Sequence, residues 1–246
     1  KGFFDWLPNQ AADVICLQET RAQPEQRSAD VFFPAGYNAY HCDAERKGYS
    51  GVAIYSRHEP DRVESGIGWP DVDAEGRWLR VDFGRLSIIS LYLPSGTSRE
   101  ERQIFKYDIM ERLKPVLTAF ANDGRDYVIC GDWNIAHRQI DLRNWRANQK
   151  NSGFLPDERQ WMDWVFDEAN WVDVFRTIEP GEDQYTWWSN RGQAWAKNVG
   201  WRIDYQIGTP QIAAKACRVE IFKDERYSDH APLIIDYKIN ARWLKS

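Results

Sequence analysis

The stretch WLRVDFGRLSIISLYL, from Trp78 to Leu93, decides the fold class. It contains two apolar runs that meet at Gly84 and Arg85, the pattern of adjacent antiparallel strands joined by a tight turn. The second run is apolar almost throughout, which is typical of a strand buried on both faces. We therefore expect this hairpin to lie in a sheet that other layers cover.

Other short apolar runs, bounded by Gly, Pro or charged residues, predict further strands. They are DVICLQ, GVAIYS, DYVICG, RIDYQIG, CRVEIF and APLIIDY. Spacing near 3.6 predicts helices from Arg99 to Ala121 and from Pro156 to Ala169, and Pro115 is expected to end or kink the first. Many buried strands with few helices indicate an α/β fold, a sandwich of two stacked mixed β-sheets flanked by helices.

The bulk composition fits one soluble globular domain. The chain has 246 residues, 43% of them hydrophobic and 28% charged, and nothing marks a linker, so we expect a single domain over residues 1–246. No apolar run approaches the roughly 18 residues of a membrane helix, so no membrane partner is expected. The 13 tryptophans either build a large core or offer flat rings to a base or a sugar. We expect most of them to be core.

The formal net charge of -5 argues by itself against a nucleic-acid partner. The distribution matters more, because basic residues outnumber acids locally from Arg138 to Lys150 and from Trp187 to Arg202. The four cysteines lack CxxC spacing and are interpreted as reduced core thiols of a cytoplasmic protein. They are Cys16, Cys42, Cys130 and Cys217.

Polar residues of the types used in metal-assisted hydrolysis end several predicted strands. Asp204 lies within the apolar strand WRIDYQ, where an acid must be paired or directed at a site. Taken singly, each of these residues has an ordinary structural explanation, but together they indicate a site. The others are Gln18 and Glu19 in VICLQET, Tyr92 in ISLYL, Asp132 and Asn134 in GDWN, and Asp229 and His230 in YSDHAP.

Hydrolysis of a phosphodiester accounts for this collection. It needs a hard cation, a group that orients or deprotonates water, and donors for the charge that develops on phosphorus. Glu19 would bind Mg²⁺ and Asp132 would act on the water. His230, kept cationic by Asp204 or by Asp229, would stabilise the developing charge. Tyr92 and Asn134 would assist it.

In chain order, QET, GYSGVAIYSR, SLYLPSG, GDWNIAH, IDLRNW, KNSGFLPDERQW, YTWW, KNVGWRIDYQ and YSDHAP closely resemble the exonuclease III family of apurinic/apyrimidinic (AP) endonucleases. This family belongs to the endonuclease/exonuclease/phosphatase folds, and the resemblance runs from Lys1 to about Tyr237. It implies a four-layer α/β sandwich, in agreement with the predicted strands. It implies a Mg²⁺-dependent nuclease, with Mn²⁺ as a substitute, that hydrolyses the phosphodiester on the 5′ side of abasic sites in duplex DNA. It also implies 3′-phosphodiesterase and 3′-to-5′ exonuclease activity, and a role in base excision repair. We expect a monomer in a bacterial cytoplasm.

The resemblance also implies roles for individual residues. Glu19 resembles the magnesium-binding glutamate, and Asp229 the acid assigned to a second metal position. Asp132 resembles the residue that activates water, and His230 the catalytic histidine paired with Asp204. Tyr92 and Asn134 resemble residues that contact the scissile phosphate. The abasic sugar would enter a pocket built by Trp187, Trp201 and Ile203, and the residues implied to contact DNA are Asn148, Asn151 and Arg191.

The chain departs from the family pattern at two places. Where many members read Tyr-x-Pro-Asn, this chain reads Tyr92, Leu93, Pro94 and Ser95, and we expect a local adjustment. The family's first strand, which ends in an active-site asparagine, falls before residue 1. We expect that strand to lie upstream, because loss of an internal strand would expose two unpaired edges.

Two other functions stay open on the sequence alone. One is a phosphatase or phosphodiesterase of the same superfamily that acts on inositol phosphates or lipids, although it would not need the KNSGF and YTWW loops with their basic flanks. The other is a catalytically silent module that binds abasic DNA. Release of phosphate from an inositol phosphate would identify the first, and DNA binding without product formation would identify the second.

Overall fold

The computed structural model describes residues 2–240, and they form two compact units. Unit 1 contains residues 2–92, 129–131 and 240, and unit 2 contains residues 93–128 and 132–239. Among the described residues, no helix combines the length and the apolar character that crossing a membrane requires. A single domain over the whole chain stays a prediction.

Unit 1 is built mainly from two antiparallel sheets. One has the order β1-β3-β2, and in the other β4 pairs with β5 and β5 pairs with β6. The predicted hairpin is confirmed, since Phe83 pairs with Leu86 across a turn in which Gly84 has a φ of 48°. The bounds are α1 (Phe3–Trp6), η1 (Leu7–Gln10), β1 (Val14–Gln18), η2 (Pro24–Arg27), η3 (Asp30–Phe32), β2 (Asn38–Cys42), β3 (Val52–Ser56), β4 (Arg62–Ser65), α2 (Pro70–Asp73), β5 (Trp78–Phe83) and β6 (Leu86–Tyr92).

The two sheets of unit 1 stack through a shared apolar cluster. Val52 and Ile54 of β3 and Leu79 and Val81 of β5 are each 0% exposed and belong to this cluster. Burial of such side chains on both sheets is worth roughly 1.5–3 kcal/mol for each side chain. The predicted stacking of two sheets is therefore seen within unit 1.

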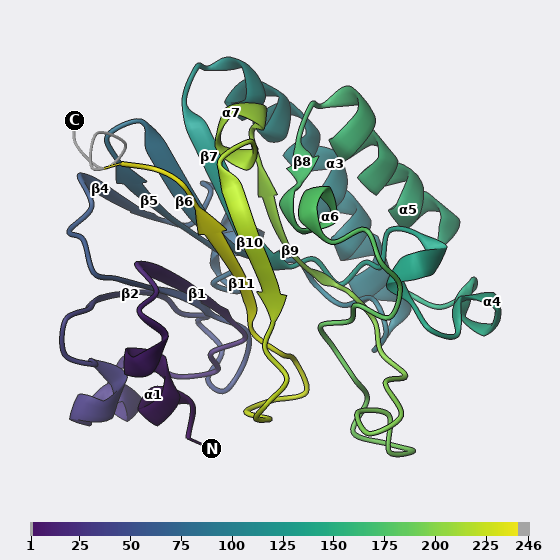
Figure 1. Cartoon of the computed structure of the whole chain (residues 1–246), viewed down its shortest axis with the longest axis horizontal. Coiled ribbons are helices and arrows are strands. Elements are labelled where there is room, and N and C mark those ends of the chain that lie inside the picture. Colours follow the sequence, from purple (N-terminus) through teal and green to yellow (C-terminus); the bar gives the residue numbers. More distant parts are fainter. Residues whose placement is uncertain (1, 241–246) are drawn as a thin grey trace. The chain divides into compact units, whose positions relative to one another are not determined.

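Unit 2 combines two strand pairs with helices. Strands β10 and β11 form an antiparallel hairpin, and β8 pairs with β9 (Figure 1). Helices α3 and α5 lie side by side, where the Trp161 indole donates to the carbonyl of Met110 at 2.8 Å. The bounds are α3 (Glu100–Asn122), β7 (Asp126–Asp132, of which Ile129–Gly131 belong to unit 1), η4 (Gln139–Asp141), α4 (Trp145–Asn148), α5 (Pro156–Asp163), η5 (Trp164–Glu168), β8 (Val172–Asp173), α6 (Val174–Ile178), β9 (Asp204–Gly208), α7 (Pro210–Ala213), β10 (Ala216–Ile221) and β11 (Leu233–Tyr237).

The structure corrects two details of the sequence analysis. Helix α3 continues through Pro115 to Asn122, because Leu113 and Leu117, both 1% exposed, anchor the turns on either side of the proline in the core. Cys217 is exposed on β10 and is therefore not a core thiol. Strands β2, β4 and β8 were not predicted, because they are short or carry polar residues.

We expect His41 on β2 to make the stability of unit 1 depend on pH. Its ring makes edge contacts with Phe33 and Tyr55, and within residues 2–240 neither ring nitrogen has a hydrogen-bond partner. Burial, helped by the charge of Arg27 and opposed by Asp43, lowers the pKa of His41 to about 4. The unfolded chain therefore binds more protons than the folded chain between about pH 6.5 and 4.

We expect the free energy of unfolding to fall by about 1–3 kcal/mol as the pH drops through this window, with the full contribution present above pH 6.5. A His41→Phe variant should show a flatter dependence in urea titrations at several pH values. An unchanged slope in His41→Phe would contradict this assignment.

Candidate functional site

Strand β7 ends in a turn that presents Asp132 and Asn134. Asn134 has a φ of 52°, a left-handed conformation that asparagine tolerates better than most residues and that often marks a functional site. Its backbone N–H donates to Asp132 Oδ1 at 2.8 Å, and its side-chain amide donates to Asp132 Oδ2 at 3.1 Å and to the Leu93 carbonyl at 2.8 Å. The turn therefore fixes the orientation of a carboxylate that is only 5% exposed.

His230 lies between two carboxylates of unit 2. Its Nδ1 is 3.0 Å from Asp204 Oδ2, and its Nε2 is 3.9 Å from Asp132 Oδ2. Burial alone would lower the pKa of His230, but the charge and hydrogen bond of Asp204, with the charges of Asp132 and Asp229, raise it to about 10. His230 is therefore an imidazolium at neutral pH. Of the two acids that the sequence offers as its partner, Asp204 and Asp229, the one that pairs with the ring is Asp204.

Asp204 is positioned by a buried hydroxyl. Its backbone N–H and that of Ile203 each lie 3.2 Å from Thr186 Oγ1, and Thr186 is 0% exposed. The Thr186 carbonyl accepts the N–H of Ala231, the residue after His230, at 2.7 Å. Thr186, in the YTWW segment, thus links by hydrogen bonds the segments that carry Asp204 and His230, and no sequence pattern indicates this role.

Asp229 makes different contacts. Its Oδ2 accepts the indole N–H of Trp187 at 3.1 Å, and its Oδ1 accepts the Ser228 hydroxyl at 3.2 Å. Burial opposes ionisation of Asp229, but the nearby His230 charge and these hydrogen bonds lower its pKa. Asp229 is therefore a carboxylate held beside the aromatic residues.

The predicted sugar-pocket residues lie together in unit 2. Trp187 and Trp201 meet edge to face, with ring centroids 6.3 Å apart, and both pack with Ile203 against Leu142 and Phe154. Trp187 also forms an isolated β-bridge with His230. Trp187 therefore contacts both Trp201, with which it forms an aromatic wall, and the backbone of His230.

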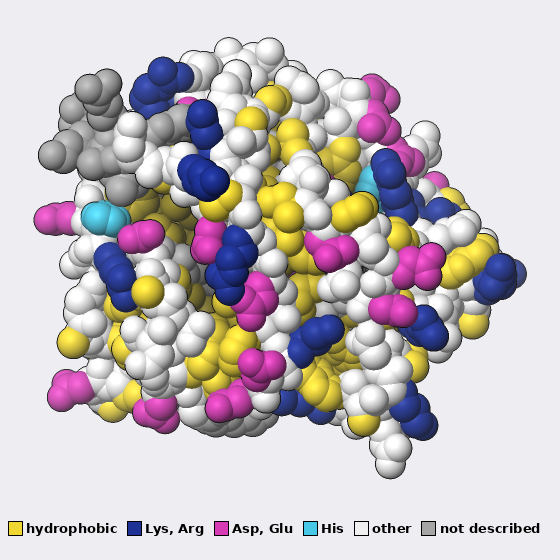
Figure 2. Space-filling model, viewed as in Figure 1, with side chains coloured by type: hydrophobic (Ala, Val, Ile, Leu, Met, Phe, Trp, Pro, Cys, Tyr) yellow, Lys and Arg dark blue, Asp and Glu magenta, His cyan; other side chains and the backbone are white. Residues whose placement is uncertain are grey.

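The predicted DNA contacts lie on surface segments of the same unit. The Asn151 amide donates to Asn148 Oδ1 at 2.7 Å, so these two side chains act as a pair, and Arg191 is exposed on the loop after Trp188. Figure 2 shows acidic and basic side chains interspersed on the face in view.

Glu19 and Tyr92 belong to unit 1. Glu19 follows β1 with a φ of 56° and forms an ion pair with Arg21. Tyr92 ends β6 with its ring 4.7 Å from the guanidinium of Arg77, which also donates to the Tyr92 carbonyl at 2.8 Å. Arg77 is 3% exposed, and no sequence pattern indicates that this arginine supports Tyr92.

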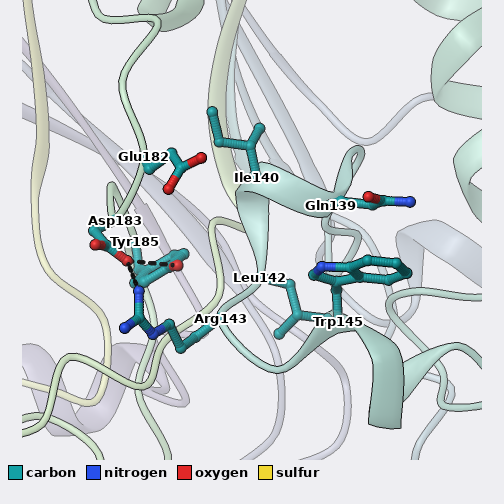
Figure 3. Close-up of a pocket in the computed structure, with 8 residues that line it drawn as sticks. All are labelled: Gln139, Ile140, Leu142, Arg143, Trp145, Glu182, Asp183 and Tyr185. Carbon is teal, nitrogen blue, oxygen red and sulfur yellow. Dashed lines mark hydrogen bonds and ion pairs between the residues drawn. The ribbon is translucent and has the colours of Figure 1, made fainter.

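A pocket of about 340 Å³ opens in unit 2 (Figure 3), and it shares Leu142 with the cluster of Trp187, Trp201 and Ile203. Arg143 and Asp183, paired at 2.6 Å, form one side of it, and Trp145 and Gln139 lie on the other. None of the predicted site residues lines this pocket. The lining residues are Gln139, Ile140, Leu142, Arg143, Trp145, Glu182, Asp183 and Tyr185.

Comparison with known proteins agrees with this geometry. The model of the endonuclease/exonuclease/phosphatase family matches residues 1–230. The chain belongs to this family. It is 37% identical to an exodeoxyribonuclease of Bacillus subtilis over 94% of this chain and 90% of that one. It is 33% identical to the DNA repair nuclease APEX1 of Danio rerio, over 96% of this chain and 76% of that one.

Solved structures give the same result. An AP endonuclease from Archaeoglobus fulgidus superimposes with a TM-score of 0.88 at 28% identity, covering 96% of this chain and 93% of that chain. A 3′ phosphatase from Neisseria, bound to a product DNA hairpin, has a TM-score of 0.86 at 25% identity, with 96% and 92% covered. The predicted α/β fold class, with several sheets flanked by helices, and the predicted hydrolase family are confirmed.

Asp132, Asp204 and His230 each offer a potential metal-ligand atom within 4.8 Å of the others. However, both ring nitrogens of His230 face carboxylates, and a protonated imidazole cannot ligate a cation. This cluster therefore suits proton transfer and phosphate binding. The carboxylates of Glu19 and Asp229 offer the oxygen ligands that Mg²⁺ prefers, so the donor types present fit that ion.

Proposed function

We propose that this protein is a Mg²⁺-dependent DNA-repair nuclease that hydrolyses the phosphodiester bond on the 5′ side of an abasic site in duplex DNA. The observation that carries the proposal is the position of the His230 ring between the carboxylates of Asp204 and Asp132, at 3.0 and 3.9 Å. The nuclease names of the relatives support DNA as the substrate. We also propose 3′-phosphodiesterase and 3′-to-5′ exonuclease activities, for which the Neisseria 3′ phosphatase is the structural support.

In the proposed reaction, Asp132 accepts a proton from the attacking water. The water oxygen forms a bond to phosphorus, and the bond from phosphorus to the 3′ oxygen of the preceding nucleotide breaks. The products are a 3′ hydroxyl, which gains a proton from solvent, and a 5′ phosphate on the abasic sugar. The turn at Asn134 holds the Asp132 carboxylate at one angle, so little reorientation is needed when the proton moves.

His230 would stabilise the charge that grows on the phosphate oxygens. Asn134 would assist once its amide releases one of its two hydrogen bonds, to Asp132 Oδ2 or to the Leu93 carbonyl. A fixed imidazolium in a partly buried site interacts more strongly with that charge than a solvated group would, because its orientation is set in advance. Asp204 is the residue that orients His230 and maintains its charge. Tyr92 is proposed as a further phosphate contact.

Trp187, Trp201 and Ile203 would receive the flipped-out abasic sugar. A site lined by indole rings and an aliphatic chain accepts a deoxyribose without its base. A normal nucleotide must bring a bulky base and lose stacking worth a few kcal/mol. Asn148, Asn151 and Arg191 would contact the DNA backbone.

Glu19 would hold the Mg²⁺, and Asp229 offers a carboxylate for a second metal position. When bound, the cation supplies charge neutralisation on the non-bridging phosphate oxygens. We also propose that the protein acts as a monomer in a bacterial cytoplasm, where free cysteines such as Cys42 and Cys130 stay reduced.

Comparing substrates tests the proposal. With Mg²⁺ present, we expect strand cleavage of a duplex that carries an abasic analogue, much slower cleavage of the undamaged duplex, and no phosphate release from a soluble inositol phosphate. Phosphate release from the inositol phosphate without DNA cleavage would favour the phosphatase. Binding of the abasic duplex without any product would favour the silent DNA-binding module.

A further inference from the structure

Two charged side chains that the proposed chemistry does not use lie fully buried beside Asn134. Lys106 of α3 and Glu158 of α5 each have 0% exposed side chain, and Lys106 Nζ lies 2.5 Å from Glu158 Oε1. A buried ion pair adds little to stability, because desolvation cancels much of the attraction between the charges. A role in positioning neighbouring groups accounts better for this pair.

Lys106 acts on the Asn134 turn. Its ammonium donates to the backbone carbonyl of Asn134 at 2.8 Å. Because Asn134 adopts a left-handed φ of 52°, its peptide orientation needs support from the surrounding structure. The hydrogen bond from Lys106 provides that support from the side of α3.

Glu158 acts on the loop that precedes α5. Its Oε2 accepts the backbone N–H of Gly153 at 2.6 Å and that of Leu155 at 3.0 Å. Its Oε1 also accepts the Gln103 amide at 3.1 Å. One carboxylate therefore fixes the loop and the ammonium of Lys106 together.

Gly153 connects this loop to the proposed site. It has a φ of 92°, and a Cβ added there would lie 3.1 Å from the Asn134 carbonyl oxygen and 3.2 Å from Cζ3 of Trp201. Its own carbonyl accepts the N–H of Ala136 at 2.7 Å. The loop thus touches both the turn that orients Asp132 and the aromatic wall at Trp201.

We propose that Lys106 and Glu158 are positioning residues, which hold the turn at Asn134 and the indole ring of Trp201 at fixed positions relative to each other. The inference rests on the proposed function, in which Asn134 contacts the phosphate and Trp201 helps to bind the abasic sugar. A displacement of about 1 Å in such a site can lower a rate by about 100-fold. The pair should therefore affect both turnover and selectivity.

The test is the double variant Lys106→Met/Glu158→Gln. It removes both charges together, so neither is left buried alone, and the glutamine oxygen can still accept a backbone N–H. We expect a folded protein with kcat about tenfold lower. The ratio of Kd values for undamaged and abasic duplex, measured in EDTA, should be about fivefold lower. The control is Leu117→Ala, on the same helix and 1% exposed, which should lower the melting temperature without changing kcat or this ratio at 25 °C.

Gly153→Ala tests the same connection without changing the ion pair. The added methyl should displace the Asn134 carbonyl or Trp201 and produce the same joint loss of kcat and selectivity. If both variants are folded and behave like Leu117→Ala, the inference is wrong. If the wild-type protein itself fails to cut abasic DNA, the proposed function has failed instead.

Discussion

Replacement of Asp132 by asparagine should lower the rate of cleavage at an abasic site by about 10³-fold, while the affinity for abasic DNA changes little. Removal of a positioned proton acceptor typically costs 10²–10⁴-fold. The amide keeps the shape of the side chain, and its oxygen can still accept the Asn134 N–H, now 2.8 Å from Asp132 Oδ1. The turn should survive, and the loss should appear in kcat.

Single-turnover cleavage and fluorescence anisotropy in EDTA would separate the chemical step from binding. Asp167→Asn is the matched control, since Asp167 is an exposed aspartate of the same unit and its replacement should leave both values unchanged. A variant that binds abasic DNA poorly but cleaves at the wild-type rate once bound would contradict the role of Asp132.

Loss of the His230 imidazolium should have the second large effect. We expect His230→Gln to lower kcat by about 10²–10³-fold, because a neutral amide cannot match a preoriented cation against developing negative charge. The Asp204 carboxylate loses its partner in this variant. Its melting temperature should therefore be compared with that of the wild type, to separate a loss of stability from a loss of kcat. Binding of abasic DNA should remain, since the proposed pocket residues are unchanged.

The dependence of activity on pH tests whether Asp204 keeps His230 charged. The folded pKa of His230 is raised to about 10, so the cationic form persists through neutral pH and activity should decline as the pH rises through about 10. Asp204→Asn removes the main group that raises this pKa, and the decline should move to lower pH. An alkaline limb at the same pH in wild type and Asp204→Asn would show that His230 does not control it.

The polar residues at strand ends were predictable, because hydrophobic runs that finish in acids are visible without a structure. Asp204 lies between the apolar residues Ile203 and Tyr205, so its charge needs a partner. His230 is that partner. The choice between Asp204 and Asp229 was not predictable. It depends on backbone contacts at Thr186, which orient Asp204.

Other features depend on tertiary packing and leave no local pattern. Lys106 and Glu158 occur on helices rich in charged residues, where a solvated position is the ordinary expectation. Their burial depends on the contact between α3 and the segment around α5. In the same way, the packing of Leu113 and Leu117 lets α3 continue past Pro115, against the local preference of proline.

The most direct test is the position of the cut. A 5′-labelled duplex with one tetrahydrofuran abasic analogue would be incubated with the protein in Mg²⁺ and, separately, in EDTA, and the products would be resolved on a sequencing gel. The proposal predicts one Mg²⁺-dependent cut immediately 5′ to the analogue. An intact strand under both conditions, or cleavage unrelated to the analogue, would contradict it.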